Sequence, residues 1–229
     1  ARLLMVNGLG ELDQTNADAI MQWLSANGAL YWTYTIMRMI GRVAFPIFCF
    51  LLVEGFLHTH DVKKYAMRLG LFALLSEIPF DLAFSSKILE FNYQNVFFTL
   101  FIGLLTMIAY RAVEEKEEWN QALKVILYIL IVAAGMALAY FLKTDYAEKG
   151  VFCIMVLYIF RKKKMWQIIA GCASFIWETP ALFGFIPIAF YNGTRGWKMK
   201  YFFYIFYPAH LLILYLLCYF MGISGYSAV

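Results

Sequence analysis

Charged residues are scarce in this chain. Only 15% of its 229 residues are Asp, Glu, Lys or Arg, whereas 63% are hydrophobic. A soluble domain carries about a quarter charged residues. The apolar residues fall in long blocks, and the short alternating segments of a strand barrel are missing. Because a helix needs about 17–25 apolar residues to cross a bilayer, the sequence predicts an all-α, polytopic transmembrane helical bundle.

The chain also lacks any cysteine pattern that would hold a metal ion or a disulfide framework. Its four cysteines lie inside apolar segments and form no CxxC or Cys/His spacing. The net charge of +4 comes from basic residues at the ends of apolar blocks, which is a topology signal and not a nucleic-acid signal. We therefore expect no metal, no disulfide and no nucleic-acid partner.

Three further features are missing. No internal repeat is evident, so the inverted-repeat signature of many transporters is not seen. No GxxxG stripe occurs in the apolar blocks, which leaves the oligomeric state unknown. The opening ARLLMV is not expected to be a signal peptide, since it lacks a basic region and a full apolar core. ARLLMV is interpreted as the end of a helix whose beginning is missing.

Seven apolar blocks predict about seven spans in a transmembrane domain at 33–229. The blocks are 33–57, 65–85, 95–111, 121–142, 146–160, 165–190 and 200–221. Pro180 and Pro187 predict a kink or break near one end of the sixth. Residues 1–32 predict an extracytoplasmic segment. It contains a short amphipathic helix, with a cap at Thr15 or Asn16 and a stop at Gly28.

Lys and Arg are distributed unevenly between the two sides of this bundle. One side receives Lys63, Lys64, Arg68, the 111–124 loop and the RKKK run at 161–164. The positive-inside rule puts that side in the cytoplasm. The seven-span arrangement then places the 86–94 and 192–200 loops outside and the C-terminus inside.

Ionisable residues stand inside the first two blocks, which are separated by a short basic turn. If the chain reverses at Thr59–His60, residues of opposite charge reach the same depth. The pairs are Arg42 with Glu77, Arg38 with Asp81 and, within two or three residues, Glu54 with Arg68. Charges at membrane depth are costly, so they pair and mark function. The sequence leaves two readings open: a functional centre, or structural pairs that fix the helix register.

The last two blocks form a second predicted hairpin around Gly193–Thr194. Glu178 and His210 then share a depth inside the apolar zone. A carboxylate beside a neutral imidazole holds a general base in one tautomer. The alternative is that His210 only hydrogen-bonds a neighbouring helix. A separate polar cluster, FNYQNVFFT, contains Asn95 near the outer end of the third block.

Three segments resemble the TraX family of bacterial integral-membrane proteins. They are IGRVAFPIFCFLLVEGFLHTHDVKKYAMRLGLFALLSEIPFDLAF, NVFFTLFIGLL and KYFFYIFYPAHLLILY, and the resemblance runs from about Tyr34 to Tyr215. The family is named for acetylation of a conjugative pilin's N-terminus, and it is similar to membrane acyltransferases that use cytoplasmic acetyl-CoA. The resemblance implies a multi-pass protein of the bacterial cytoplasmic (inner) membrane. It also implies an acetyl-CoA-dependent acetyltransferase that acts on an amine or hydroxyl, in a protein N-terminus or a glycan.

The resemblance also assigns roles to the residues singled out above. Arg42, partly neutralised by Glu77, would polarise the thioester carbonyl, and His210, oriented by Glu178, would be the base. Asp81 joins the catalytic group. The CoA phosphates would bind His58, Lys63, Lys64 and Arg68. Glu54 and Asn95 would contact the acceptor. Family members usually begin with a helix that carries an Asp-His pair, which this sequence does not show.

Two other function classes compete with this reading. A small transporter or channel would use the charged hairpin to line its pathway. A non-catalytic membrane assembly factor would use the charged pairs only to hold its shape, so that the charges of a pair would be exchangeable.

Overall fold

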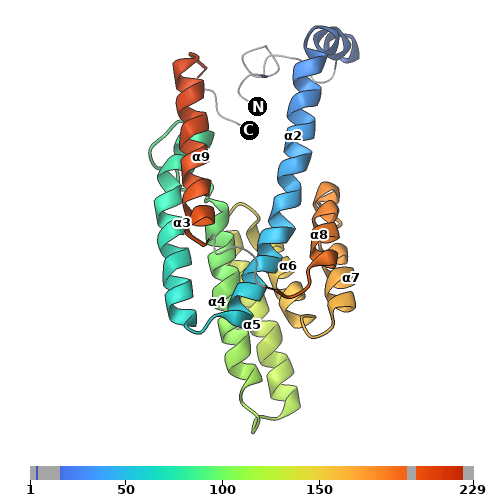
Figure 1. Cartoon of the computed structure of the whole chain (residues 1–229), viewed down its shortest axis with the longest axis vertical. Coiled ribbons are helices and arrows are strands. Elements are labelled where there is room, and N and C mark those ends of the chain that lie inside the picture. The colour runs from blue at the N-terminus through green and yellow to red at the C-terminus, as the bar shows by residue number, and fades with distance from the viewer. Residues whose placement is uncertain (1–3, 5–15, 195–199, 224–229) are drawn as a thin grey trace. The chain divides into compact units, whose positions relative to one another are not determined.

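Helices make up the described part of the chain. The computed structural model describes residues 4, 16–194 and 200–223, in which the only extended pairing is an isolated bridge between Gln94 and Thr144. The helices are α2 (Ala17–His58), α3 (Val62–Ser85), α4 (Val96–Glu114), α5 (Gln121–Phe141), α6 (Ala147–Ile159), α7 (Lys164–Ser174), the 3-10 helix η2 (Thr179–Gly184), α8 (Phe185–Phe190) and α9 (Lys200–Phe220) (Figure 1). The all-α prediction is confirmed.

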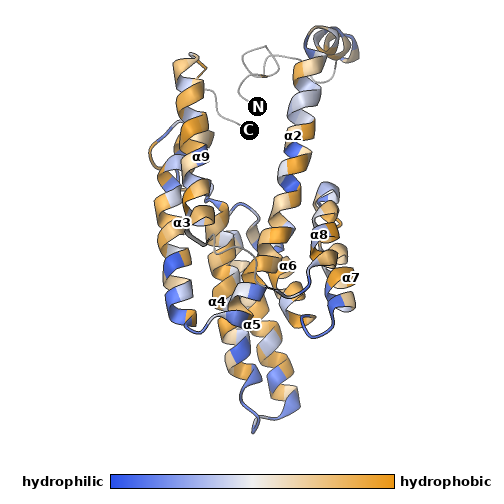
Figure 2. Ribbon diagram, in the orientation of Figure 1, coloured by the Kyte–Doolittle hydropathy of each residue, from blue (hydrophilic) through white to orange (hydrophobic). Residues whose placement is uncertain are grey.

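Four helices among the described residues are long and apolar enough to cross a membrane, namely α2, α4, α5 and α9. Figure 2 shows the orange of apolar residues along these helices, with blue at the tip of the α4–α5 turn. α6 has 13 residues and α7 has 11. At 1.5 Å per residue they reach about 20 Å and 17 Å, short of the about 30 Å of hydrocarbon. The protein is a multi-pass membrane protein, but the count of about seven spans is not confirmed.

The helices fall into two compact units. The larger unit comprises residues 42–76 and 91–198, and the smaller unit comprises residues 1–41, 77–90 and 199–229. α4, α5 and α6 pack against one another in the larger unit, and α7 packs against α6. Glycine allows close approach there, because a Cβ on Gly103 would lie 2.5 Å from Ile154 Cδ1.

Asparagine side chains begin two of these helices. Asn120 caps α5 by accepting a hydrogen bond from the Ala122 amide at 2.9 Å. Asn95 caps α4 through the Phe97 amide at 3.0 Å, and its Nδ2 donates to the Ala73 carbonyl of α3 at 2.9 Å. Asn95 is fully buried. Its hydrogen bonds join α3 to α4, and the acceptor contact predicted for it stays a prediction.

The first helix begins where the sequence predicts and continues further than predicted. The Asn16 side chain accepts from the amides of Asp18 and Ala19 at 3.1 and 3.2 Å, which confirms the cap. The stop at Gly28 is wrong, because α2 is helical from Ala17 to His58. One glycine costs a helix only about 1 kcal/mol. Residues 1–3 and 5–15 lie outside the described residues, so the extracytoplasmic segment at 1–32 stays a prediction.

The segment from Lys164 to Tyr191 forms a hairpin, which we call the α7–α8 hairpin. α7 runs away from the α6–α7 turn, the chain reverses at 175–178, and α8 returns along α7 (Figure 1). At the open end, Lys164 Nζ donates to the Tyr191 carbonyl. Along its length, Gly171 is in close contact with the Phe185 ring. Both ends of this segment therefore lie on the same side.

The α7–α8 hairpin corrects the predicted sixth span. Residues 165–190 do not cross in one helix, because the helix breaks after Ser174 and neither arm is long enough to span the bilayer. The predicted break is real, but it precedes Pro180 and reverses the chain. The 192–200 loop therefore starts at the RKKK end and not at the opposite end, as the seven-span arrangement required. The orientation of the C-terminus stays a prediction.

Candidate functional site

Arg42 is the centre of a polar cluster in the larger unit. Its Nη1 lies 3.0 Å from Glu178 Oε2, and the two side chains are 28% and 21% exposed. The guanidinium also hydrogen-bonds the Tyr146 hydroxyl, and its carbon lies 5.9 Å from the Tyr146 ring centroid. Arg42 comes from α2, Glu178 from the tip of the α7–α8 hairpin, and Tyr146 from the residue before α6. We call these three residues the Arg42 site.

Aromatic rings surround the Arg42 site. Phe45, one turn after Arg42, stacks on Tyr146 with centroids 3.4 Å apart, and Phe175 meets Phe45 edge-on at 5.9 Å. Trp177, beside Glu178, contacts the Tyr146 ring at 6.1 Å. The Lys149 ammonium lies 5.1 Å from the Trp177 ring centroid. Apolar rings next to an ion pair lower the local dielectric constant, which strengthens the electrostatic interaction between the charges.

Asp145 brings a second carboxylate to this region. It accepts a hydrogen bond from the Tyr93 hydroxyl and interacts with the Arg42 charge. Burial raises the pKa of the Asp145 carboxyl, and the Tyr93 hydrogen bond and the Arg42 charge oppose that rise. Burial also raises the pKa of Tyr93, with the Asp145 charge as a second cause, so the phenol is neutral at pH 7.

Two connecting segments hold Tyr93, Asp145 and Tyr146 in place. Residues 91–95 lie beside residues 142–146, and the Gln94 amide donates to the Lys143 carbonyl at 3.0 Å. The Tyr146 amide donates to Thr99 Oγ1 of α4 at 3.4 Å. Gly150 lets α6 lie close to α4, because a Cβ there would clash with Thr99 Cγ2 of α4. These contacts fix the start of α6 against α4.

The backbone at the tip of the hairpin leaves carbonyl groups without helical partners. The Ser174 carbonyl accepts from Trp177 Nε1 at 2.8 Å and from Cys153 Sγ at 3.3 Å. Non-helical backbone at membrane depth is tolerated only where protein buries it or where it lines a cavity. The tip also lies against α2, because a Cβ on Gly184 would be 2.6 Å from Pro46 Cγ. Because the hairpin packs on α2, the Glu178 side chain lies next to Arg42.

The structure joins two predicted site residues that the sequence had paired with others. Arg42 was expected opposite Glu77, and Glu178 opposite His210; instead, Arg42 and Glu178 pair with each other. Glu77 and His210 belong to the smaller unit, and their predicted pairings stay predictions. Within that unit, His210 Nδ1 lies 2.9 Å from the Phe206 carbonyl oxygen, and the His210 ring stacks on Phe206.

The other two predicted pairs do not form among the described residues. Arg38 donates to the Tyr34 hydroxyl at 2.7 Å, while the buried Asp81 accepts from the Glu90 amide at 2.7 Å. Glu54 lies 3.8 Å from His58 and hydrogen-bonds Tyr191, with no ion pair to Arg68. Equal depth fixes a position along the helix axis but not the rotation about it, so matched residues need not face each other.

The residues predicted to bind the CoA phosphates lie at or near the α2–α3 turn, and their contacts differ. Lys64 pairs with Asp61 at 3.1 Å, and His58 Nδ1 lies 2.9 Å from the Glu54 carbonyl oxygen. Lys63 has no ion pair within the described part of the chain. Arg68 Nε is buried with no hydrogen-bond partner there. Anion binding at this turn stays a prediction.

Sequence reasoning missed Asp145, Tyr146, Trp177 and the Tyr93 hydroxyl. A signal existed for two of them. Asp145 is an acidic residue between two apolar blocks, and Tyr93 lies inside the polar cluster FNYQNVFFT. Neither signal shows that 91–95 and 142–146 lie side by side. In the described ranges, no three His, Cys, Asp or Glu residues gather as a metal site.

A second ion pair lies at the other end of the larger unit. Arg161 Nη2 contacts both oxygens of Glu114, at 2.8 and 2.6 Å, and its guanidinium covers the Tyr158 ring at 3.9 Å. The Tyr158 hydroxyl donates to Glu114 at 3.4 Å. Arg161 is only 13% exposed. The first residue of RKKK therefore fastens α6 to α4, in addition to its value as a topology signal.

Comparison with known proteins identifies a family and a similar protein. A family model described as TraX protein matches residues 21–218. The chain is also 27% identical over 208 residues to the probable fimbrial assembly protein FimC, serogroup H1, of Dichelobacter nodosus. That alignment covers 80% of this chain and 83% of the relative. No solved structure matches the chain.

Proposed function

Because the chain belongs to the TraX family, we propose that it is a membrane acyltransferase that moves an acetyl group from acetyl-CoA to an amine or hydroxyl acceptor. The observation that carries this proposal is the Arg42 site, a guanidinium held between a carboxylate and a phenol at the tip of a broken helix. Irregular backbone and paired charges at membrane depth are features of functional sites.

Acyl transfer from a thioester needs two kinds of help. The acceptor attacks the carbonyl carbon, the new C–N or C–O bond forms, and the C–S bond breaks. Negative charge develops on the carbonyl oxygen, and the acceptor loses a proton. Arg42 would stabilise that oxygen, with Glu178 holding the guanidinium in place. Burial, and secondly the Asp145 charge, raises the pKa of the Tyr146 phenol to about 12. The phenol therefore keeps its proton and would donate a second hydrogen bond to that oxygen.

Two groups are candidates for the proton acceptor. His210 is the candidate from the sequence, which expected it beside Glu178; Glu77 and Asp81 are the other catalytic residues that the family resemblance implies. Asp145 is a second candidate, since its raised pKa suits a base better than that of an exposed carboxylate. A base whose pKa lies closer to neutral pH is still deprotonated in part and binds the proton more tightly.

The donor would approach from the basic end of the larger unit, which we propose to be cytoplasmic in a bacterial inner membrane. His58, Lys63, Lys64 and Arg68 are the proposed contacts to the CoA phosphates. From His58 to Arg42, α2 rises about 24 Å at 1.5 Å per residue. A donor bound at the α2–α3 turn must therefore extend along most of this length to bring its thioester to the Arg42 site.

The test is transfer of radiolabelled acetyl groups by membranes that contain the protein. Membranes are incubated with labelled acetyl-CoA and acceptor peptides with free or blocked N-termini. We expect transfer to the free amine and a loss of about 100-fold or more for Arg42→Gln, the cost of removing an oxyanion-stabilising group. Lys116→Gln, at the α4–α5 turn, is the control and keeps full activity. Undiminished transfer by Arg42→Gln would refute the proposal.

The comparison supports a second candidate, a non-catalytic assembly factor. The relative from Dichelobacter nodosus is described as a probable fimbrial assembly protein. In this reading Arg42 and Glu178 only fasten the α7–α8 hairpin to α2. It predicts that fimbrial assembly in cells survives any change at Arg42 that leaves the protein folded. Loss of assembly with a normal level of folded protein would contradict it.

A further inference from the structure

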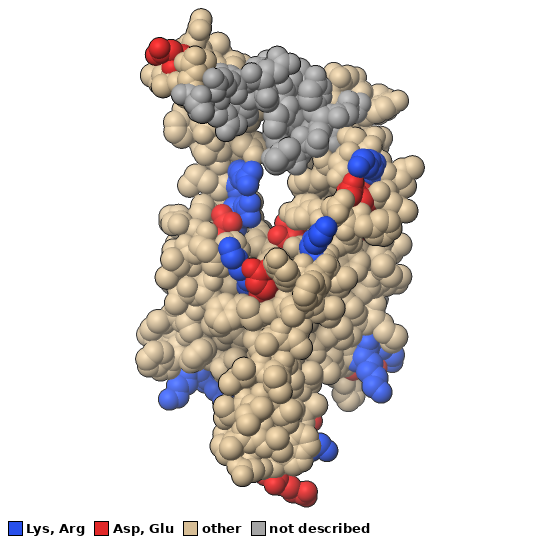
Figure 3. All heavy atoms as spheres, turned by 180° about the vertical axis from the view of Figure 1, so that it is seen from behind, with Lys and Arg blue, Asp and Glu red and all other residues tan. Residues whose placement is uncertain are grey.

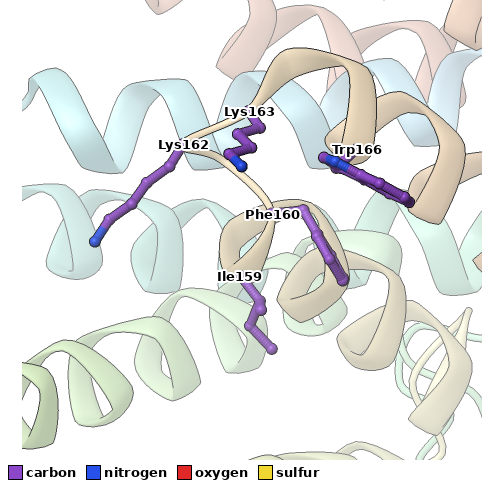
Figure 4. Close-up of a pocket in the computed structure, with 5 residues that line it drawn as sticks. All are labelled: Ile159, Phe160, Lys162, Lys163 and Trp166. Carbon is purple, nitrogen blue, oxygen red and sulfur yellow. The ribbon is translucent and has the colours of Figure 1, made fainter.

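The α6–α7 turn holds a pocket that the Arg42 site does not use. Its volume is about 420 Å³, and it is lined by Ile159, Phe160, Lys162, Lys163 and Trp166. Figure 4 shows the two lysines leaving the turn, with the Phe160 ring on one side and the Trp166 ring on another. The pocket thus combines cations with an apolar lining.

The charge of the two lysines is largely uncompensated. Glu114 is the nearby acid, and its two oxygens are engaged by Arg161 at 2.6 and 2.8 Å. Lys162 comes only to 3.9 Å from Glu114 and is 79% exposed. Lys163 has no ion pair within the described ranges. On the face seen in Figure 3, some blue basic side chains lie near the end of the α4–α5 turn, and others lie elsewhere on the face beside red acidic ones.

The apolar part of the pocket continues onto a helix face. Ile159, Phe160 and Trp166 are 41%, 40% and 53% exposed, and Met165 and Ile169 extend the exposed surface along α7. A phospholipid has the matching chemistry, a phosphate joined to hydrocarbon chains. A free phosphate would use the lysines but gain nothing from the apolar strip. Trp and Lys are also the residues that favour the level of lipid headgroups.

We propose that this pocket binds an anionic phospholipid. Lys162 and Lys163 contact the phosphate, and the acyl chain lies over Ile159, Phe160 and Trp166. The α6–α7 turn is the base of the α7–α8 hairpin, where Lys164 holds the Tyr191 carbonyl. A bound lipid stabilises the base of the α7–α8 hairpin, which holds Glu178 next to Arg42. The lipid site is independent of the acyltransferase proposal, because its test measures binding.

The test is lipid binding to the purified full chain in detergent, measured by native mass spectrometry. Phosphatidylglycerol and phosphatidylcholine with identical chains are titrated in parallel. A lysine near a membrane surface contributes about fivefold to binding of an anionic lipid, so Lys162→Gln with Lys163→Gln should weaken phosphatidylglycerol binding about 30-fold. Trp166→Ala should weaken the binding of phosphatidylglycerol and of phosphatidylcholine by the same factor, because both lipids have the same chains.

A matched control removes the same charge from another basic position. Lys116→Gln with Lys124→Gln, near the α4–α5 turn, should leave phosphatidylglycerol binding within about twofold of wild type. Three results would overturn the proposal. They are equal affinity for the two lipids, equal loss in the control pair, and full displacement of phosphatidylglycerol by inorganic phosphate or coenzyme A at the concentration of the lipid.

Discussion

Adding side chain at Gly171 should push the two arms of the α7–α8 hairpin apart. A Cβ at this position would lie 2.8 Å from Phe185 Cζ and 2.9 Å from Leu157 Cδ2. Phe185 and Leu157 are buried, at 3% and 0% exposure, so neither has room to move. Overpacking costs about 1–3 kcal/mol, while alanine recovers about 1 kcal/mol of helix propensity. We expect Gly171→Ala to lose about 0–2 kcal/mol and Gly171→Val about 3 kcal/mol.

Thermal unfolding in detergent, followed by tryptophan fluorescence, measures this loss. In a chain of this size about 1 kcal/mol moves Tm by about 2–4 °C, so Gly171→Val should lower Tm by about 6–12 °C. Gly41→Ala is the control, because a Cβ at Gly41 meets no atom within 4 Å. It should hold or raise Tm. An unchanged Tm for Gly171→Val would refute the close packing of α8 on α7.

Three further predictions follow from the same structure. In a cysteine-free background, Lys163→Cys and Asn192→Cys should react with an impermeant maleimide from the same side of the membrane; reaction from opposite sides would restore a spanning helix. Since burial raises the Asp145 pKa above 3.8, the folded chain binds that proton more tightly than the unfolded chain, and stability falls as pH rises through the folded pKa. Asp145→Asn should flatten this fall above about pH 4 in Tm measurements, and an unchanged slope would exclude Asp145 as its source. Glu114→Gln leaves the half-buried Arg161 without its ion pair and should lower Tm by about 4–8 °C, from about 2 kcal/mol. The double variant with Arg161→Gln should lose less than the sum of the single variants.

The sequence predicts most helix positions closely, because apolar blocks and their polar ends are local features. The blocks 121–142 and 146–160 correspond to α5 and α6 within about two residues. The block 165–190 is different. Its composition is apolar throughout, so hydropathy does not reveal that the chain reverses at 175–178. That reversal depends on packing of Gly171 and Gly184 against other helices, which no local pattern contains.

The candidate site was predicted only in part, for a geometric reason. Arg42 and Glu178 were both recognised as charges at membrane depth, and that inference came from the energetics of burial. Their partnership was not recognised, because it depends on the reversal of the hairpin. Tyr93 and Asp145 are 52 residues apart in sequence and meet through two connecting segments, and depth matching does not apply to such contacts.

Exchanging the charges of the Arg42–Glu178 pair tests the central claim most directly. The double variant Arg42→Glu with Glu178→Arg keeps an ion pair between α2 and the hairpin, so it should recover most of the Tm lost by either single variant. If Arg42 stabilises the developing oxyanion, acetyl transfer in the double variant stays about 100-fold or more below wild type. If acetyl transfer or fimbrial assembly returns together with Tm, the central claim is wrong, and the Arg42–Glu178 pair has a purely structural role.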